Sequence, residues 1–182
     1  MVVDFRHQKR KAVSAFYGRE ELETDMTHFN ASRPDDPFDL NRFLQAQEND
    51  YAQALLEIRS GQKRTHWIWF IFPQLDGLAF SSTSKHFAIK SRQEATAYLD
   101  HPVLGARLLE CATALCQVEG KTAQQILGST DALKVKSCAT LFAQVSPAGS
   151  LFERLLARYY ESESDAKTLQ LLSRKSESAS QL

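Results

Sequence analysis

Beyond position 37, apolar residues recur at three- and four-residue steps, the spacing of one face of an α-helix. The clearest pattern spans residues 40–58 and ends before Gly61, and we place its N-cap at Asp39. No segment keeps the two-residue alternation of a half-buried strand. The pattern therefore predicts an all-α fold, a single compact multi-helix domain with short loops.

Start and stop signals divide the rest of this region into further helices. Ser91 and Glu94 have capping-box spacing before residues 95–99, and Pro102 suits the first turn of the next helix. Thr122 and Gln125 form a second capping-box pattern, whose helix ends at Gly128. Three more helices are expected: residues 131–145, a segment opened by Ser146-Pro147, and residues 165–172. The expected buried stripes are Leu104, Leu108, Cys111, Ala112 and Leu115; Cys138, Leu141, Phe142 and Val145; and Phe152, Leu155, Leu156 and Tyr159.

The two ends of the chain have a different composition. Residues 1–36 are charged, weakly periodic and bounded by a Pro-Asp-Asp-Pro turn, so we interpret them as an N-terminal extension or linker. Residues 37–173 form the expected helical domain. Residues 174–182 are Ser-rich and charged, which predicts a disordered tail.

The charge balance narrows the classes of partner. The 182 residues carry 22 basic and 22 acidic side chains, whereas a dedicated DNA-binding domain normally has a basic excess, so nucleic acid is disfavoured as a partner. No apolar run reaches the roughly 18 residues of a membrane span, and the N-terminus has no signal-peptide core. We therefore expect a cytoplasmic protein without a membrane partner.

The sequence contains no motif typical of a metal site or a cofactor site. The five histidines have no paired spacing, the three cysteines form no CxxC motif, and no glycine-rich phosphate loop occurs. We predict no metal and no cofactor, and we interpret the cysteines as small buried hydrophobes. A nucleophile pair of Cys111 with His66 is formally possible, but nothing in the sequence places the two together.

Residues 59–74 depart from the helical pattern. Both tryptophans, Trp67 and Trp69, lie here, and the first of them stands three residues after a basic cluster. The aromatics could fill the core, either as a strand-like element or as a short helix stopped by Pro73. Alternatively, the polar side chains that bracket them could converge on a pocket: His66 can exchange protons, Arg64 can clamp an anion, and Gln74 can orient a ligand.

Two polar residues elsewhere could contribute to the same pocket. Gln47 interrupts the buried stripe of the first helix, so it either satisfies a buried backbone group or lines a pocket. Lys134 follows Asp131 in the first turn of a helix, where a cap and a solvated lysine are the alternative explanation.

Several motifs in this chain resemble a bacterial family catalogued as domain of unknown function 1810. The similarity covers roughly residues 37–172, and its most specific part is the His66-Trp67-x-Trp69-Phe70 signature. The other matching motifs are Asp39-Leu40-x-Arg42-Phe43-x-x-Ala46-Gln47, Tyr51-x-x-Ala54-Leu55-x-Glu57-Ile58-Arg59, His101-Pro102-x-Leu104-Gly105-x-Arg107-Leu108-x-Glu110-Cys111 and Asp131-x-x-Lys134-x-x-Ser137. The resemblance implies an all-α fold and no established activity.

The resemblance also marks polar residues that could meet the His66 site: Gln47, Tyr51, Arg59, Arg107, Lys134 and Ser137. The chain departs from the family pattern at Phe87, where the family often has tyrosine. It departs again at Thr130, where the family often has proline. No role that needs the tyrosine hydroxyl can be transferred to this chain.

Three hypotheses follow. In the first, a small anionic or nucleotide-type ligand binds at Arg64, His66, Trp67, Trp69, Gln74, Gln47 and Lys134; in an enzyme, His66 would transfer protons. In the second, the basic turn of residues 59–64, from Arg59 to Arg64, binds nucleic acid or an acidic protein. In the third, the domain has no local site. The sequence leaves open whether the protein is an enzyme and what its oligomeric state is.

Overall fold

The computed structural model describes residues 36–179, which belong to one of the two compact units of the chain, Ser32–Leu182. The predicted extension of residues 1–36 lies outside the described region, apart from its last residue. The described region forms α-helices and no β-strand, with an isolated bridge between Leu75 and Ile89, so the all-α prediction is confirmed. The helices are α1 (Asn41–Arg59), α2 (Ile68–Ile71), α3 (Ser82–His86), α4 (Arg92–Asp100), α5 (Leu104–Cys116), α6 (Ala123–Leu127), α7 (Ser129–Ala143), α8 (Leu151–Tyr160) and α9 (Ala166–Ala179).

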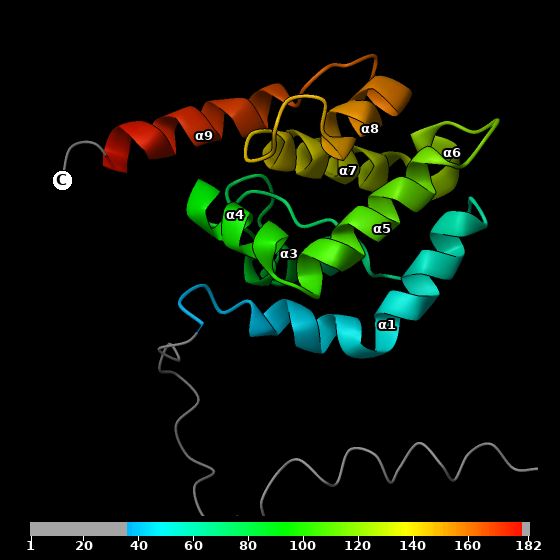
Figure 1. Ribbon diagram of the computed structural model, residues 1–182, viewed down its shortest axis with the longest axis horizontal. Helices are drawn as coiled ribbons and strands as arrows, with labels where there is room; N and C mark the ends of the chain where they lie inside the picture. Colours follow the sequence, from blue (N-terminus) through cyan, green and yellow to red (C-terminus); the bar gives the residue numbers. More distant parts are fainter. Residues whose placement is uncertain (1–35, 180–182) are drawn as a thin grey trace, which may run out of the picture. The chain divides into compact units, whose positions relative to one another are not determined.

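Two helices organise the packing. Helix α5 contacts α1, α4 and α8, while α7 contacts α6, α8 and α9 (Figure 1). The stripe predicted for α5 is buried throughout, from Leu104 to Leu115. In α7 the buried stripe includes Cys138, Leu141 and Phe142. The 3.6-residue periodicity of the sequence therefore corresponds to the packed faces of both helices.

A row of aromatic rings joins four of the helices through the centre of the core. Tyr98 of α4 packs edge-on against Phe43 of α1, with ring centroids 5.0 Å apart. On its other side Tyr98 lies 5.6 Å from Phe142 of α7, which stacks at 5.4 Å on Phe152 of α8. All four side chains are almost completely buried. Tyr98 also reaches the backbone of α2, so this row fixes α2 against the core.

The start of α1 is held by Asp36 rather than by Asp39, and our prediction of an Asp39 N-cap is wrong. The carboxylate of Asp36 accepts hydrogen bonds from the backbone N–H groups of Leu40 and Asn41, at 2.8 and 3.0 Å. Asp39 adopts a left-handed conformation with φ 51° and supplies a backbone carbonyl to Arg42 instead.

Arg42 and Glu94 form a buried junction between α1, α4 and the loop that follows α3. Arg42 uses all five N–H donors of its guanidinium group. Four bonds go to the backbone carbonyls of Phe38, Asp39, His86 and Ala88, and the fifth goes to Glu94 Oε1 at 2.5 Å. The second carboxylate oxygen of Glu94 accepts the backbone N–H of Lys90. This junction ties three distant segments of the chain together.

Helix boundaries follow the capping signals at α4 and α6, but Ser146-Pro147 does not open a helix, since α8 begins at Leu151 and is capped by Ser150. The Thr122–Gln125 capping box is present in full, and Gly128 ends α6 as expected. Ser91 caps α4 through the N–H of Glu94, whereas the Glu94 side chain turns to Arg42. Helix α9 continues to Ala179, beyond residue 174, where we expected the tail to begin; Leu172 is buried on its inner face.

Helices α4 and α5 approach each other at Gly105. A β-carbon placed there would lie 1.9 Å from the backbone oxygen of Leu99, so any larger residue would force the two segments apart. Within residues 36–179, no helix combines the length and the apolar character that a membrane crossing requires.

Candidate functional site

The loop in front of Trp67 is organised by one buried carboxylate, that of Glu57 near the end of α1. Its Oε2 accepts the backbone N–H groups of Arg64 and Thr65 at 2.8 and 3.0 Å, and the indole Nε1–H of Trp67 at 2.8 Å. Its Oε1 accepts bonds from the Thr65 hydroxyl and the Gln53 amide. Glu57 is 3% exposed. All these donors are neutral, and together they fix residues 64–67 against α1.

Hydrogen bonding determines the protonation state of Glu57. Burial by itself would raise the pKa of this carboxyl, because it disfavours the charged form. The bonds from Gln53, from the backbone N–H groups of Arg64 and Thr65, and from Trp67 outweigh burial and lower the pKa to about 2. Glu57 is therefore a charged anchor of the loop at neutral pH.

The aromatic segment after this loop is the one-turn helix α2, so the short-helix interpretation is correct and the strand-like one is wrong. Trp67 is 1% exposed and lies at the N-cap of α2, where its indole is held by Glu57. Phe70 and Phe72 are buried as well. Trp69 is only partly buried. Its ring is the aromatic surface of this segment that can reach solvent.

Two lysines from different segments meet over the tryptophans. Lys63 Nζ lies 2.6 Å from Asp131 Oδ2, and Lys134 Nζ lies 2.7 Å from Asp131 Oδ1. The Lys63 ammonium is 5.1 Å from the ring centre of Trp67, and that of Lys134 is 4.4 Å from the ring centre of Trp69, so each makes a cation–π contact. These five residues constitute what we call the lysine cluster. It carries a net charge of about +1 from two cations and one anion.

The lysine cluster is shielded from solvent but not sealed. The side chains of Lys63, Lys134 and Asp131 are 9%, 15% and 16% exposed. Burial tends to raise the pKa of Asp131, yet the bonds and charges of Lys134 and Lys63 outweigh it and lower the pKa. Lys134 is thus an ion-paired, mostly buried lysine, and our alternative of a solvated lysine is wrong.

The first turn of α7 adjoins this cluster and has no side-chain cap. Its N-cap is Gly128, at φ 83°, and no side chain of the described region bonds to the helix start. The first intrahelical-type bond runs from Ala132 N to Gly128 O. The N–H groups of Ser129, Thr130 and Asp131 precede it and have no partner within the helix. Uncapped N–H groups and the helix dipole together attract anions.

The remaining polar residues of the predicted site do not join the lysine cluster. His66 is exposed, and within residues 36–179 we find no hydrogen bond, ion pair or ring contact of its side chain. Arg64 is exposed and bonds to Gln62 Oε1 at 3.0 Å. Gln74 lies beyond α2, where its backbone oxygen accepts the N–H of Ile89. The catalytic role of His66 stays a prediction.

Gln47 satisfies a buried backbone group, the carbonyl of Phe70, which was one of the two roles that we predicted for it. Its Nε2 donates to the carbonyl of Phe70 at 2.7 Å and to the Tyr98 hydroxyl at 3.1 Å. Its Oε1 accepts a bond from Arg107 at 3.3 Å. Gln47 is 1% exposed. It therefore supports α2 and Arg107 from within the core, and no atom of it is presented to the lysine cluster.

Comparison with known proteins identifies the family. Residues 37–172 match the model of a family described as "Protein of unknown function (DUF1810)". The chain belongs to this family. A similar solved structure is that of the conserved hypothetical protein Rv1873 from Mycobacterium tuberculosis, 46% identical, with a TM-score of 0.74 over 76% of this chain and 99% of that chain. A search of curated proteins found no match. These relatives give the DUF1810 fold and no activity.

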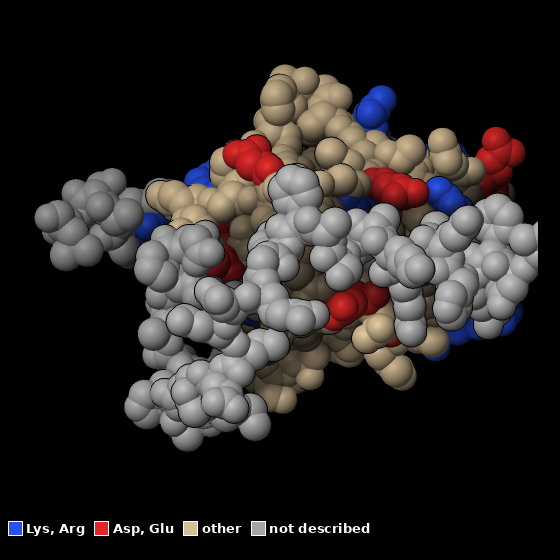
Figure 2. All heavy atoms as spheres, turned by 60° about the horizontal axis from the view of Figure 1, so that its bottom comes forward, with Lys and Arg blue, Asp and Glu red and all other residues tan. Residues whose placement is uncertain are grey.

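In this DUF1810 member, two of the three basic side chains of residues 59–64 form ion pairs. Arg59 pairs with Glu110 at 3.0 Å, and Lys63 is held by Asp131. Trp67 is buried, whereas a stacking platform for nucleic acid needs an accessible ring. Figure 2 displays acidic and basic side chains interspersed on the face that it presents. The geometry thus gives the second hypothesis no support beyond the exposed Arg64.

The described region shows neither a cluster of metal ligands nor an activated thiol. Within the described region, no three side chains of His, Cys, Asp or Glu gather closely enough to hold a metal ion. Cys111 and Cys138 are buried in the core, and burial raises the pKa of both thiols, that of Cys111 to about 12. Thiols in such an environment are poor nucleophiles at neutral pH.

Three features of this region were not predicted from the sequence: the role of Glu57, that of Lys63 and the pairing of Asp131 with both lysines. Glu57 stands three residues after the buried Ala54 and directly before the buried Ile58, so it interrupts the apolar face just as Gln47 does. The criterion that identified Gln47 would have identified Glu57 as well. The pairing of Lys63 with Asp131, 68 positions later in the chain, has no local signal.

Proposed function

We propose that this protein binds a small phosphate-bearing ligand at the lysine cluster and the adjoining start of α7. The observation that carries the proposal is the meeting of Lys63 and Lys134 beside an uncapped helix N-terminus. The two ammonium groups share the carboxylate of Asp131, which leaves about one positive charge among these three side chains; the ionised Glu57 bonds to Trp67 and to neither ammonium group. The free N–H groups of the first turn of α7 supply directional donors.

The kind of anion follows from the kind of donor. Lysine ammonium groups attract an anion as point charges, and backbone N–H groups donate hydrogen bonds to it. A phosphate has enough oxygens to accept from both kinds of group. The exposed Arg64 follows Lys63 in the sequence, but its guanidinium group bonds to Gln62 and contacts no residue of the lysine cluster. His66 borders the same loop and is our candidate for a proton-transfer group should the bound ligand react.

A nucleotide is the more specific version of this ligand. Its base would need an aromatic surface, and Trp69 is the partly exposed ring at the cluster. One face of that ring is already covered by the Lys134 ammonium at 4.4 Å. A base would therefore have to use the other face or displace Lys134. We accordingly propose that the phosphate is the group that the protein recognises. Whether the base is recognised as well is decided by the experiment below.

Intrinsic fluorescence provides a direct test, because both tryptophans of the chain belong to the lysine cluster. Inorganic pyrophosphate is titrated into the full chain while tryptophan emission is recorded. We expect saturable binding that weakens with added salt, and at least about tenfold weaker binding in Lys63→Met and Lys134→Met. Adenosine diphosphate binding about tenfold more tightly than pyrophosphate would indicate that the base is recognised as well.

Lys136→Met is the matched control. Lys136 lies on the same helix, but it pairs with Glu163 and contacts Tyr160. Its loss should leave pyrophosphate binding unchanged. An emission that does not respond to pyrophosphate or to adenosine diphosphate would refute the proposal, as would equal losses of affinity in all three lysine variants.

A further inference from the structure

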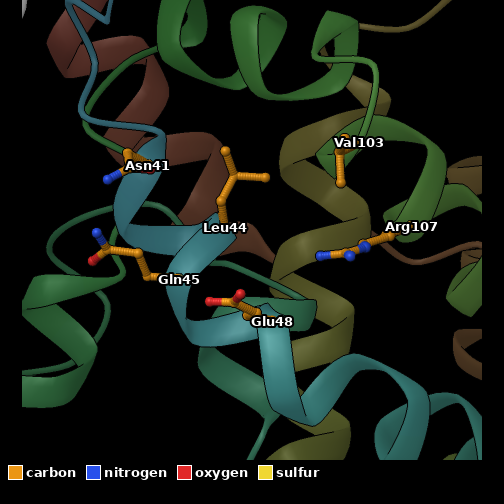
Figure 3. A pocket seen from close by; sticks show the side chains of 6 residues that line it. All are labelled: Asn41, Leu44, Gln45, Glu48, Val103 and Arg107. Atoms are coloured by element: carbon orange, nitrogen blue, oxygen red, sulfur yellow. The ribbon is translucent and has the colours of Figure 1, made fainter. Parts of the chain in front are cut away.

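A second polar site lies between α1 and α5. An open cavity of about 270 Å³ separates the first turns of α1 from the start of α5 (Figure 3). Asn41, Leu44, Gln45 and Glu48 line it from α1, and Val103 and Arg107 line it from the other side. None of these six residues belongs to the lysine cluster.

Arg107 is held in place by a layer of residues behind it. Its guanidinium carbon lies 4.7 Å from the ring centre of Tyr51, and its Nη1 donates to Gln47 Oε1. Gln47 is itself fixed by the carbonyl of Phe70 and by Tyr98. The Tyr51 hydroxyl bonds to Glu110, which also pairs with Arg59. Such a supporting layer fixes the direction in which an arginine fork points.

The guanidinium group nevertheless has no carboxylate partner. Within residues 36–179 no ion pair of Arg107 is found, and one of its five N–H donors bonds to a protein acceptor. Arg42, by contrast, uses all five. In Figure 3 the Arg107 guanidinium extends from α5 toward α1, across the cavity. Its free donors match the two oxygens of a carboxylate.

Glu48 brings the opposite charge to the same cavity. Its carboxylate is exposed on α1, one turn after Leu44, and it forms no ion pair with Arg107 or with another described cation. A ligand with two negative charges, such as a phosphate monoester, would be repelled by Glu48. A ligand with one carboxylate and one ammonium group would satisfy both side chains.

The size and lining of the cavity limit the ligand further. Its volume lies just below the roughly 300–1,000 Å³ of pockets for drug-sized molecules. Leu44 and Val103 offer apolar contact for a short carbon chain, and Asn41 and Gln45 offer amides. We propose that this cavity binds a small zwitterion of the amino-acid class, whose carboxylate pairs with Arg107 and whose ammonium group pairs with Glu48.

Matched probes test both charges separately. The common L-amino acids are added singly to the full chain, and the Arg107 Nε–H resonance is followed by NMR. For the amino acid that binds most tightly, we expect its analogue without the amino group and its analogue without the carboxyl group to bind at least about tenfold more weakly. Two variants complete the test, with the affinity measured by calorimetry because Arg107→Lys has no arginine resonance to follow. Arg107→Lys should weaken binding at least about tenfold, and Glu48→Gln should reduce the affinity to that of the analogue without the amino group.

Two controls keep the result interpretable. Glu48 is exposed, so its variant should fold even if Arg107→Lys is destabilised. Lys63→Met, which alters only the lysine cluster, should leave amino-acid binding unchanged, so this site and the phosphate site can fail independently. If no amino acid shifts the Arg107 resonance, or if the analogue without the amino group binds as tightly, the proposal is overturned.

Discussion

Glu57 and Glu94 are both buried, 3% and 2% exposed, but their charges are stabilised in different ways. Glu94 faces Arg42 at 2.5 Å, within a junction that joins α1, α4 and the loop after α3. Glu57 faces no cation. Neutral N–H and O–H donors surround it, and most of them come from the loop in front of α2.

The difference shows that Glu94 stabilises the packing of the fold, whereas Glu57 positions the candidate site. An ion pair between secondary-structure elements stabilises their packing and presents nothing to a ligand. A carboxylate that gathers backbone N–H groups fixes the course of a loop. In this protein the loop leads from Lys63 to Trp67, so Glu57 positions half of the lysine cluster.

The largest effect is expected at the Arg42–Glu94 junction. Arg42→Met leaves Glu94 buried without its cation and frees four backbone carbonyls. The free energy of unfolding, measured by urea denaturation, should fall by about 3–5 kcal/mol. Adding Glu94→Gln to this variant should restore part of the loss. No restoration in the double variant would contradict the interpretation of the junction as a charge pair.

A smaller loss is expected at Glu57. Glu57→Gln keeps the shape of the side chain but replaces charge-assisted bonds by neutral ones, and the free energy of unfolding should fall by about 2–3 kcal/mol. Tryptophan emission should shift as well, because Trp67 loses a carboxylate partner. Gln53→Ala, which removes one peripheral donor, should lower the same free energy by about 1 kcal/mol or less. Equal losses in both variants would count against Glu57 as the anchor.

Acid should weaken the Glu57 anchor in a defined pH range. The pKa of Glu57 is lowered from 4.5 to about 2 in the folded protein, so its stabilisation is complete above the unfolded-state pKa and is lost as pH falls toward the folded-state pKa. Between pH 7 and pH 3.5 the difference in stability between wild type and Glu57→Gln should shrink by about 1 kcal/mol. Urea titrations at both pH values measure it, and a constant difference would exclude this protonation as the cause.

The smallest stability effect is expected within the lysine cluster. Lys134→Met should change the free energy of unfolding by about 1 kcal/mol or less, because Asp131 keeps Lys63 as a partner and the methionine keeps the contact with Trp69. The same variant should lose pyrophosphate binding. If the free energy of unfolding fell by several kcal/mol, Lys134 would be a residue that stabilises the fold, as Arg42 does.

The sequence was informative for most features that depend on neighbouring residues, although the N-cap of α1 was predicted at the wrong residue. The three- and four-residue spacing located α1, α5 and α7, and the capping-box pattern located α6, because side chains a few positions apart meet on a helix. Gln47 was identified as a polar residue on an apolar face, which is also a local property.

The tertiary pairings had no such signal. Arg42 and Glu94 stand 52 positions apart, and Lys63 and Asp131 stand 68 apart, so only the folded chain brings them together. The convergence that we expected of Arg64, His66 and Gln74 assumed that the ends of a short element face the same space. Within residues 36–179 no contact among these three side chains is found, so their convergence stays a prediction. The lysine cluster forms where the loop meets α7.

The most direct test of the central claim is to locate the bound anion. Pyrophosphate is added to ¹⁵N-labelled protein, and the backbone amide resonances are followed by NMR. We expect the largest shifts at Ser129, Thr130 and Asp131 and at the indole N–H of Trp69, and we expect Glu57→Gln to weaken these shifts at equal pyrophosphate concentration. Shifts confined to Arg107 and its neighbours, or spread evenly over exposed lysines and arginines, would contradict the claim.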